Sequence, residues 1–283
     1  MGLRIQNNVE AFNTHRQLTT TSTAASKSME KLSSGYRINR AADDAAGLAI
    51  SEKMRGQIGG LAQAQRNAQD GISLVQTAEG ALTEVHSMLQ RVRDLKVQYN
   101  NGTNSNDDKV AIAAEVAQIA SEVSDIVSDT KFNGTAVFGP GQTFSFQVGA
   151  NDGETISTSA TTFASGVGSG GLSNLTGITG ASGASAALNS GGALGGLSDI
   201  DNAIKNVSKV RADLGAIQNR LEHRLNNLAT YQENLTASES RIRDVDMAAE
   251  MTKFTKLNIL QQAGTSMLSQ ANQAPQGVLA LLR

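Results

Sequence analysis

Residues 48–99, LAISEKMRGQIGGLAQAQRNAQDGISLVQTAEGALTEVHSMLQRVRDLKVQY, predict one uninterrupted helix, and this helix decides the fold. Mostly small or apolar side chains occupy two positions of a seven-residue repeat, and no proline interrupts the repeat. At ~1.5 Å per residue such a helix is roughly 60 to 75 Å long, which exceeds the width of a compact globule. The stretch therefore predicts an elongated, rod-shaped protein. The two columns of the repeat are Met54, Leu61, Ala68, Val75, Leu82 and Leu89, and Gln57, Ala64, Gly71, Ala78, Val85 and Val92.

Two further stretches carry apolar stripes at helical spacing. The first contains Ile112, Val116, Ile119, Val123 and Ile126. The second contains Ile200, Val207, Leu214, Leu221, Leu228 and Leu235, and is widened by Ala203, Val210, Ile217 and Tyr231. Three helices with matching stripes can pack lengthwise as a bundle. We therefore expect a mainly α fold, an elongated coiled-coil or helical-bundle rod with a small β-hairpin region.

The two ends of the chain carry weaker helical stripes, in residues 3–34 and 241–274. Thinly apolar helices of this kind are marginal in water without tertiary partners. The simplest arrangement pairs the first helix with the last and joins them to the bundle through residues 31–47, where Gly35 supplies a bend and Asp43 or Asp44 caps the next helix. Pro275 is expected to end the last helix.

The middle of the chain changes character at Lys131. Apolar and polar residues alternate there around a Gly-Pro-Gly break, which predicts a β-hairpin with Phe144, Phe146 and Val148 on one face and Ile156 extending the ladder. Residues 165–197 are rich in glycine and serine and are predicted to form an irregular surface loop.

Composition excludes several classes of function. The chain has 283 residues, a formal net charge of −2 and no cysteine. A nearly balanced charge without basic clusters argues against nucleic-acid binding. The absence of thiolates, and of ligand spacing around the three histidines, argues against a zinc site, and no phosphate-binding loop is present. No apolar run is long enough for a membrane span, so we expect no membrane insertion. Because metal-ligand spacing and a phosphate-binding loop are also missing, we expect no cofactor.

Four long motifs give the chain a family resemblance. They are LSSGYRINRAADDAAGLAISEKMRGQI (32–58), NAQDGISLVQTAEGALTEVHSMLQRVRDL (67–95), RLEHRLNNLATYQENLTASESRIRDVDMAAEM (220–251) and QANQAPQGVLALLR (270–283). These motifs resemble the N- and C-terminal regions of bacterial flagellins, the subunits of the flagellar filament. Tyr36 and Lys96 depart from the aliphatic or small residues usual in the family, and both are expected to alter contacts between subunits rather than the fold.

The resemblance implies a domain plan. Residues 1–46 and 241–283 would form the two halves of an inner core domain, and residues 47–138 and 198–240 the two halves of the helical bundle domain. Residues 139–197 would hold only the hairpin and the Gly/Ser-rich loop in place of the outer domains found in larger flagellins. The resemblance therefore implies a short form of flagellin with a minimal outer domain.

The resemblance also implies partners and sites. The chain is expected to form a homopolymer outside the cell, after type III export in an unfolded state, and to meet flagellar cap and hook-junction proteins and a chaperone at its C-terminal region. Residues that match the flagellin surface read by the host Toll-like receptor are Gln90, Arg91, Leu95 and Glu115. The residues expected to pack between subunits in the filament core are Ile5, Val9, Phe12, Met251, Phe254, Leu257, Leu260, Met267 and Leu268.

Three alternatives stay open at this stage. A hook–filament junction protein has similar terminal helices but would not extend into long filaments. An enzyme hidden in the hairpin region would need a nucleophile and base, and no such set of residues is present. An adhesin would need a sizeable exposed domain, which residues 165–197 are too glycine-rich to build.

Overall fold

The computed structural model describes residues 8–138, 142–158, 178, 180–189, 192 and 194–281. The chain is mainly α-helical with small β regions, which confirms the predicted fold class. It divides into two compact units, one made of Met1–Gln57 with Glu233–Arg283 and the other of Ile58–Gln232. Helices α2 (Ala45–Tyr99) and α7 (Leu197–Arg243) each contribute to both units.

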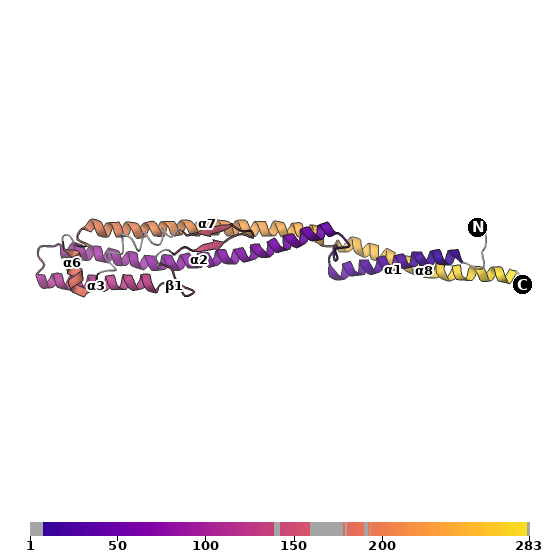
Figure 1. The fold of residues 1–283 in the computed structure, drawn as a ribbon, viewed down its shortest axis with the longest axis horizontal. Coiled ribbons are helices and arrows are strands. Elements are labelled where there is room, and N and C mark those ends of the chain that lie inside the picture. The colour runs from indigo at the N-terminus through magenta and orange to yellow at the C-terminus, as the bar shows by residue number, and fades with distance from the viewer. Residues whose placement is uncertain are drawn as a thin grey trace. The chain divides into compact units, whose positions relative to one another are not determined.

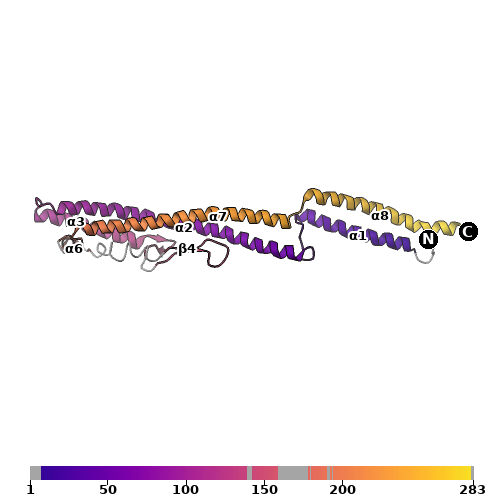
Figure 2. The same cartoon turned by 90° about the horizontal axis from the view of Figure 1, so that it is seen from above.

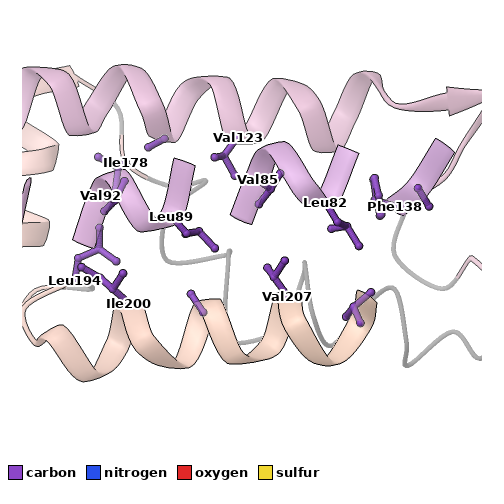
Figure 3. Close-up of a cluster of buried hydrophobic side chains, with 14 of the residues drawn as sticks. Leu82, Val85, Leu89, Val92, Val123, Phe138, Ile178, Leu194, Ile200 and Val207 are labelled. Atoms are coloured by element: carbon purple, nitrogen blue, oxygen red, sulfur yellow. The ribbon is translucent and has the colours of Figure 1, made fainter. Parts of the chain in front are cut away.

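The second unit is a bundle in which α2, α3 (Asn106–Asp129) and α7 run alongside one another (Figures 1 and 2). Its core is formed by the stripes that the seven-residue spacing predicts. Leu82, Leu89 and Val92 of α2 are fully buried and lie between Val123 of α3 and Val207 of α7 (Figure 3). The heptad stripe of α2 is therefore confirmed from Leu61 to Val92.

The stripe of α7 is confirmed from Ile200 to Leu228, but its predicted widening at Tyr231 is wrong. Ala203, Val210 and Ile217 are buried, whereas Tyr231 is 45% exposed. One heptad before Tyr231, the half-buried Arg224 donates from Nε to the carbonyl oxygen of Val148 at 3.1 Å. The residues that widen the α7 stripe are buried only where another element lies against them. Tyr231 lies one heptad beyond the contact between Arg224 and Val148.

Helix α3 begins with a capping box. Ser105 accepts a hydrogen bond from the amide of Asp108, and the Asp108 carboxylate accepts one from the amide of Ser105. These two bonds pair amides that have no partner inside the helix. The hydrogen bonds from Ser105 hold the pKa of Asp108 below its usual value.

The predicted β region contains a hairpin of β3 (Ser145–Gln147) paired antiparallel with β4 (Thr155–Ser157), with Phe146 opposite Ile156. Residues 148–154 connect these two strands, so the expected break at Gly-Pro-Gly is not the turn of this hairpin. A second, smaller hairpin that the sequence did not separate from it joins β1 (Lys131–Phe132) to β2 (Thr135–Ala136). Its turn residues Asn133 and Gly134 both have positive φ, at 48° and 80°. This geometry favours Asn-Gly and closes the strands within two residues. The Gly-Pro-Gly segment itself, 139–141, lies outside the described residues.

The predicted loop over residues 165–197 is wrong in its C-terminal part. Gly180–Leu188 form helix α6, in which Ala184, Ala187 and Leu188 are buried in the bundle core. Alanine is the best helix former, and its small side chain lets α6 lie close to its neighbour α3. Residues 159–177 lie outside the described part of the chain.

The first unit contains α1 (Val9–Ser34) packed antiparallel on α8 (Met247–Leu281), and both views show the two helices side by side (Figures 1 and 2). Gly35 ends α1 in the left-handed conformation with φ of 75°, as the predicted bend requires. Asp44 caps α2 by accepting from the amide of Gly47 at 2.8 Å. The expected end of the last helix at Pro275 is wrong, because α8 continues to Leu281.

Candidate assembly surface

The terminal unit exposes most of the large hydrophobic side chains that the described residues leave in solvent. Of thirteen such side chains, ten belong to this unit, although the bundle unit is the larger of the two. Among the described residues of the terminal unit, Ala25, Ile38 and Ala271 are the only buried hydrophobic ones. The described part of this unit therefore has almost no core of its own. On its two paired helices the exposed side chains are Val9, Phe12, Met29, Met247, Met251, Ile259, Leu260 and Met267, and we call this set the terminal apolar surface.

The residues predicted to pack between subunits fall into two groups. Val9, Phe12, Met251, Leu260 and Met267 are exposed, by between 46% and 71%. The half-buried members are Phe254, Leu257 and Leu268, and Ile5 lies outside the described residues. Helix α8 therefore carries apolar side chains both among its partly covered positions and on its open side. Exposed apolar side chains that gather on one surface are typical of a site of protein association.

A groove of about 890 Å³ lies between the beginning of α1 and the later part of α8. Val9, Phe12 and Met267 line it together with polar residues. Its walls come from both terminal helices, so the groove exists only when α1 and α8 are paired. Apolar side chains from another molecule would be removed from water if they entered it, which is the main favourable term in protein association.

Two specific polar contacts join α1 to α8. Asn8 donates from Nδ2 to the carbonyl oxygen of Ala271 at 2.8 Å. At the other end of the pair, the hydroxyl of the buried Ser28 donates to the Glu250 carboxylate. Burial opposes ionisation of Glu250, but the Ser28 hydroxyl and Lys253 outweigh it, so that the pKa of Glu250 lies below its usual value. Hydrogen bonds thus join the two helices near both ends of the pair.

Tyr36 and Arg243 lie together where α1 and α7 end. The Arg243 guanidinium lies 4.9 Å from the centre of the Tyr36 ring, and its Nη1 forms an ion pair with Glu52 Oε1 at 2.5 Å. The hydrogen bond from Arg243 lowers the pKa of Glu52. Tyr36 also forms an antiparallel bridge with Asp244 and remains 37% exposed. Its expected effect on contacts between subunits stays a prediction.

Lys96 lies inside the fold rather than on a surface. The residue is 2% exposed, its Nζ donates to the carbonyl oxygen of Leu188, and it lies 5.4 Å from the centre of the Tyr99 ring. Burial lowers the pKa of Lys96. The expectation that Lys96 alters contacts between subunits is therefore wrong, because its side chain is buried within the bundle unit against the end of α6.

Three of the four residues that match the receptor-recognition surface are exposed on the bundle. Arg91 of α2 forms an ion pair with Glu115 of α3 at 2.6 Å, and the Gln90 amide lies 3.1 Å from His86 Nε2. Leu95 differs from them, since it is 1% exposed and belongs to the bundle core. The structure thus brings Arg91 and Glu115 together and places Leu95 beneath the surface.

Both terminal regions of the chain match family models. Residues 5–143 match the bacterial flagellin N-terminal helical region, and residues 197–282 match the bacterial flagellin C-terminal helical region. The flagellin of Halalkalibacterium halodurans is 51% identical over 280 residues, which cover 99% of each chain. The chain belongs to the bacterial flagellins.

Two other relatives also match over nearly the whole chain. The flagellin of Bacillus subtilis is 50% identical over 305 residues, and the flagellar filament 33 kDa core protein of Treponema phagedenis is 46% identical over 291 residues. The match to the crystal structure of Bacillus cereus flagellin covers 58% of this chain and 88% of that chain, with 31% sequence identity and a TM-score of 0.46. Flagellins are structural proteins, and this chain is a structural subunit of the flagellar filament. A hook–filament junction protein is not favoured.

Two further findings concern metal ions and membranes. Among the described residues, no three His, Asp or Glu side chains come together as a metal site. The helices of that part of the chain also lack an apolar stretch long enough to cross a membrane.

The sequence did not predict the burial of Lys96 or the hydrogen bond of Asn8, because each depends on a partner at least 90 residues away.

Proposed function

We propose that the terminal helices of this flagellin complete their folding only when neighbouring copies cover the terminal apolar surface. The observation that carries this proposal is the contrast, among the described residues of the terminal unit, between ten exposed large hydrophobic residues and three buried hydrophobic ones. Transferring a Phe, Leu or Met side chain from water to a packed interface contributes about 1.5 to 3 kcal/mol. A neighbouring copy therefore supplies the burial that the single chain lacks, and assembly and ordering are one event.

The same property accounts for how the subunit reaches its place. A chain whose ends are unfolded before assembly can pass through a narrow type III export channel, as the flagellin family implies, and order itself at the tip of an extracellular filament. Flagellar cap and hook-junction proteins would meet the subunit there. A chaperone that covers residues 241–283 during export would hide the larger part of the terminal apolar surface, because five of its eight residues lie on α8.

Hydrogen exchange on monomer and on filament tests the proposal. We expect amides of α1 and α8 to exchange rapidly in the monomer and slowly in the filament, whereas amides in the bundle part of α2, α3 and α7 are protected in both. The bundle amides are the internal control. Strong protection of α1 and α8 in the isolated monomer would overturn the proposal, because those helices would then be stable without neighbours.

We also propose that the surface formed by Gln90, Arg91 and Glu115 is recognised by the host Toll-like receptor that senses flagellin. The supporting observation is the ion pair between Arg91 and Glu115, which brings two exposed charged residues from different helices together on one surface. Because Leu95 is buried, its contribution would be to support α2 from beneath rather than to contact the receptor directly.

A receptor-reporter assay on monomer tests this second role. Arg91→Ala is expected to weaken the response strongly. Arg93→Ala is the matched control, since Arg93 also forms an exposed ion pair, with Asp201, but points to nearly the opposite side of α2. Equal responses of the parent and Arg91→Ala would discard the assignment, and an equal loss in both variants would place the contact elsewhere on α2.

A further inference from the structure

Helix α8 contains a main-chain carbonyl group whose usual helical donor is missing. In an α-helix each amide donates to the carbonyl oxygen four residues earlier, and proline has no amide hydrogen. Pro275 lies within α8, so the carbonyl oxygen of Ala271 lacks its helical donor. Ala271 is only 8% exposed, which limits the access of water to that oxygen.

Asn8 supplies the missing donor. Its Nδ2 lies 2.8 Å from the carbonyl oxygen of Ala271, and its Oδ1 accepts from the amide of Ala11 at 3.0 Å. The second bond caps the N-terminus of α1. A carboxamide has one acceptor oxygen and one donor nitrogen, so both groups of the side chain are used at once. The orientation of the Asn8 carboxamide follows from its partners, since the main-chain carbonyl of Ala271 only accepts and the main-chain N–H of Ala11 only donates.

This contact differs from the rest of the α1–α8 interface. Leu18 against Gly264 and the other apolar contacts are non-directional, and such contacts tolerate a shift of one helix along the other. A shift of one turn, about 5.4 Å, would leave the Ala271 oxygen without a donor, and an unsatisfied buried acceptor is costly. The polar pair at the other end, Ser28 with Glu250, has a longer and more flexible acceptor side chain.

We propose that Asn8 is the positioning residue that sets the register of α1 on α8, by replacing the hydrogen bond that Pro275 removes. The register determines where Phe12 and Met267 lie relative to each other, and both line the groove that a neighbouring copy would meet. Asn8 therefore links the N-terminal cap of α1 to the shape of the terminal apolar surface. The proposal concerns subunits within the filament and rests on assembly of the intact chain.

The test is a double-mutant cycle on the critical concentration for polymerisation. Asn8→Ser keeps a good N-cap residue but is too short to reach Ala271. Pro275→Ala restores the helical donor to the Ala271 oxygen and makes the Asn8 bond redundant. Asn8→Ser is expected to raise the critical concentration roughly fivefold in the parent, the factor that one hydrogen bond worth about 1 kcal/mol gives, and to change it less than twofold in the Pro275→Ala background.

A direct readout of register accompanies the cycle. A Cβ atom placed on Gly264 would lie 3.9 Å from the Cβ of Leu18, which is within the range for a disulfide. Because the chain has no cysteine, Leu18→Cys with Gly264→Cys reports this one pairing. The disulfide is expected to form readily within each subunit of parent filaments and several-fold more slowly when Asn8→Ser is added. This readout also decides the matter if Pro275→Ala does not polymerise.

Two results would overturn the proposal. One is an equal rise in critical concentration in both backgrounds, which would show that Asn8 acts without reference to Pro275. The other is no effect of Asn8→Ser on either the critical concentration or the rate of disulfide formation. Failure of the parent chain itself to polymerise would count against the filament function instead, so the two failures are distinguishable.

Discussion

The ammonium group of Lys96 donates a hydrogen bond to the main-chain carbonyl oxygen of Leu188, which joins α2 to the C-terminal end of α6. The last carbonyls of a helix have no partner within it and carry the negative end of its dipole, so a cation there is favourable. The neighbouring Tyr99 hydroxyl donates to Asn189 Oδ1 at 3.1 Å. Two side chains near the end of α2 therefore hold the end of α6 in place.

Lys96→Met is expected to destabilise the bundle unit. Methionine keeps an unbranched apolar side chain of similar length but leaves the Leu188 oxygen without its donor, which costs about 1 to 3 kcal/mol. Lys96→Ala should cost more, because it also leaves a cavity beside α6. Denaturant unfolding of the monomer measures both variants. If Lys96→Met has the same free energy of unfolding as the parent, the hydrogen bond from Lys96 to Leu188 does not stabilise α6, since apolar packing would then account for the whole effect.

The lowered pKa of Lys96 gives a second prediction, in the alkaline range. Burial depresses the pKa in the folded state below that of the unfolded chain, which is about 10.4, so between the two values the unfolded state binds more protons. Stability contributed by this group therefore rises as the pH increases through the folded-state pKa. The free energy of unfolding of the parent, minus that of Lys96→Met, should increase toward pH 10. A flat difference would show that the ammonium is not penalised by burial.

Gly71 and Gly80 form a matched pair on α2. A Cβ on Gly71 would meet the ring of Phe146 at 3.1 Å and Leu221 Cδ1 at 3.3 Å, whereas nothing lies within 4 Å of a Cβ on Gly80. Gly80→Ala should stabilise the chain by about 0.4 to 1 kcal/mol through helix propensity. Gly71→Ala should lose that gain and destabilise by about 1 kcal/mol or more, because the ring must move. Thermal unfolding of the two variants tests whether the β3–β4 hairpin packs on α2 as described.

The sequence predicted the bundle because its signal is periodic and long. The heptad stripe of α2 and the stripe of α7 repeat the same small set of residues over many turns, so chance matches are few. Helix α6 could not be found this way, since GASGASAAL has no polar face and sits in a glycine-rich segment. Pro275 misled the prediction for a related reason. A proline is tolerated in a helix when the carbonyl it leaves free finds another donor, and that donor, Asn8, lies 263 residues away in the sequence.

Phe12 provides the sharpest test of the terminal apolar surface. Its side chain is 71% exposed in the single chain and belongs to the terminal unit, so Phe12→Ser removes little internal packing and should leave unfolding of the bundle unit unchanged. Polymerisation should weaken strongly, because about 2 kcal/mol of burial against a neighbour is lost, equivalent to a roughly thirtyfold rise in critical concentration. Val110→Ser is the control, as Val110 is 53% exposed but belongs to the bundle unit. If both variants polymerise as the parent does, the exposed phenylalanine is not covered in the filament, and the surface that drives assembly must lie elsewhere on the subunit.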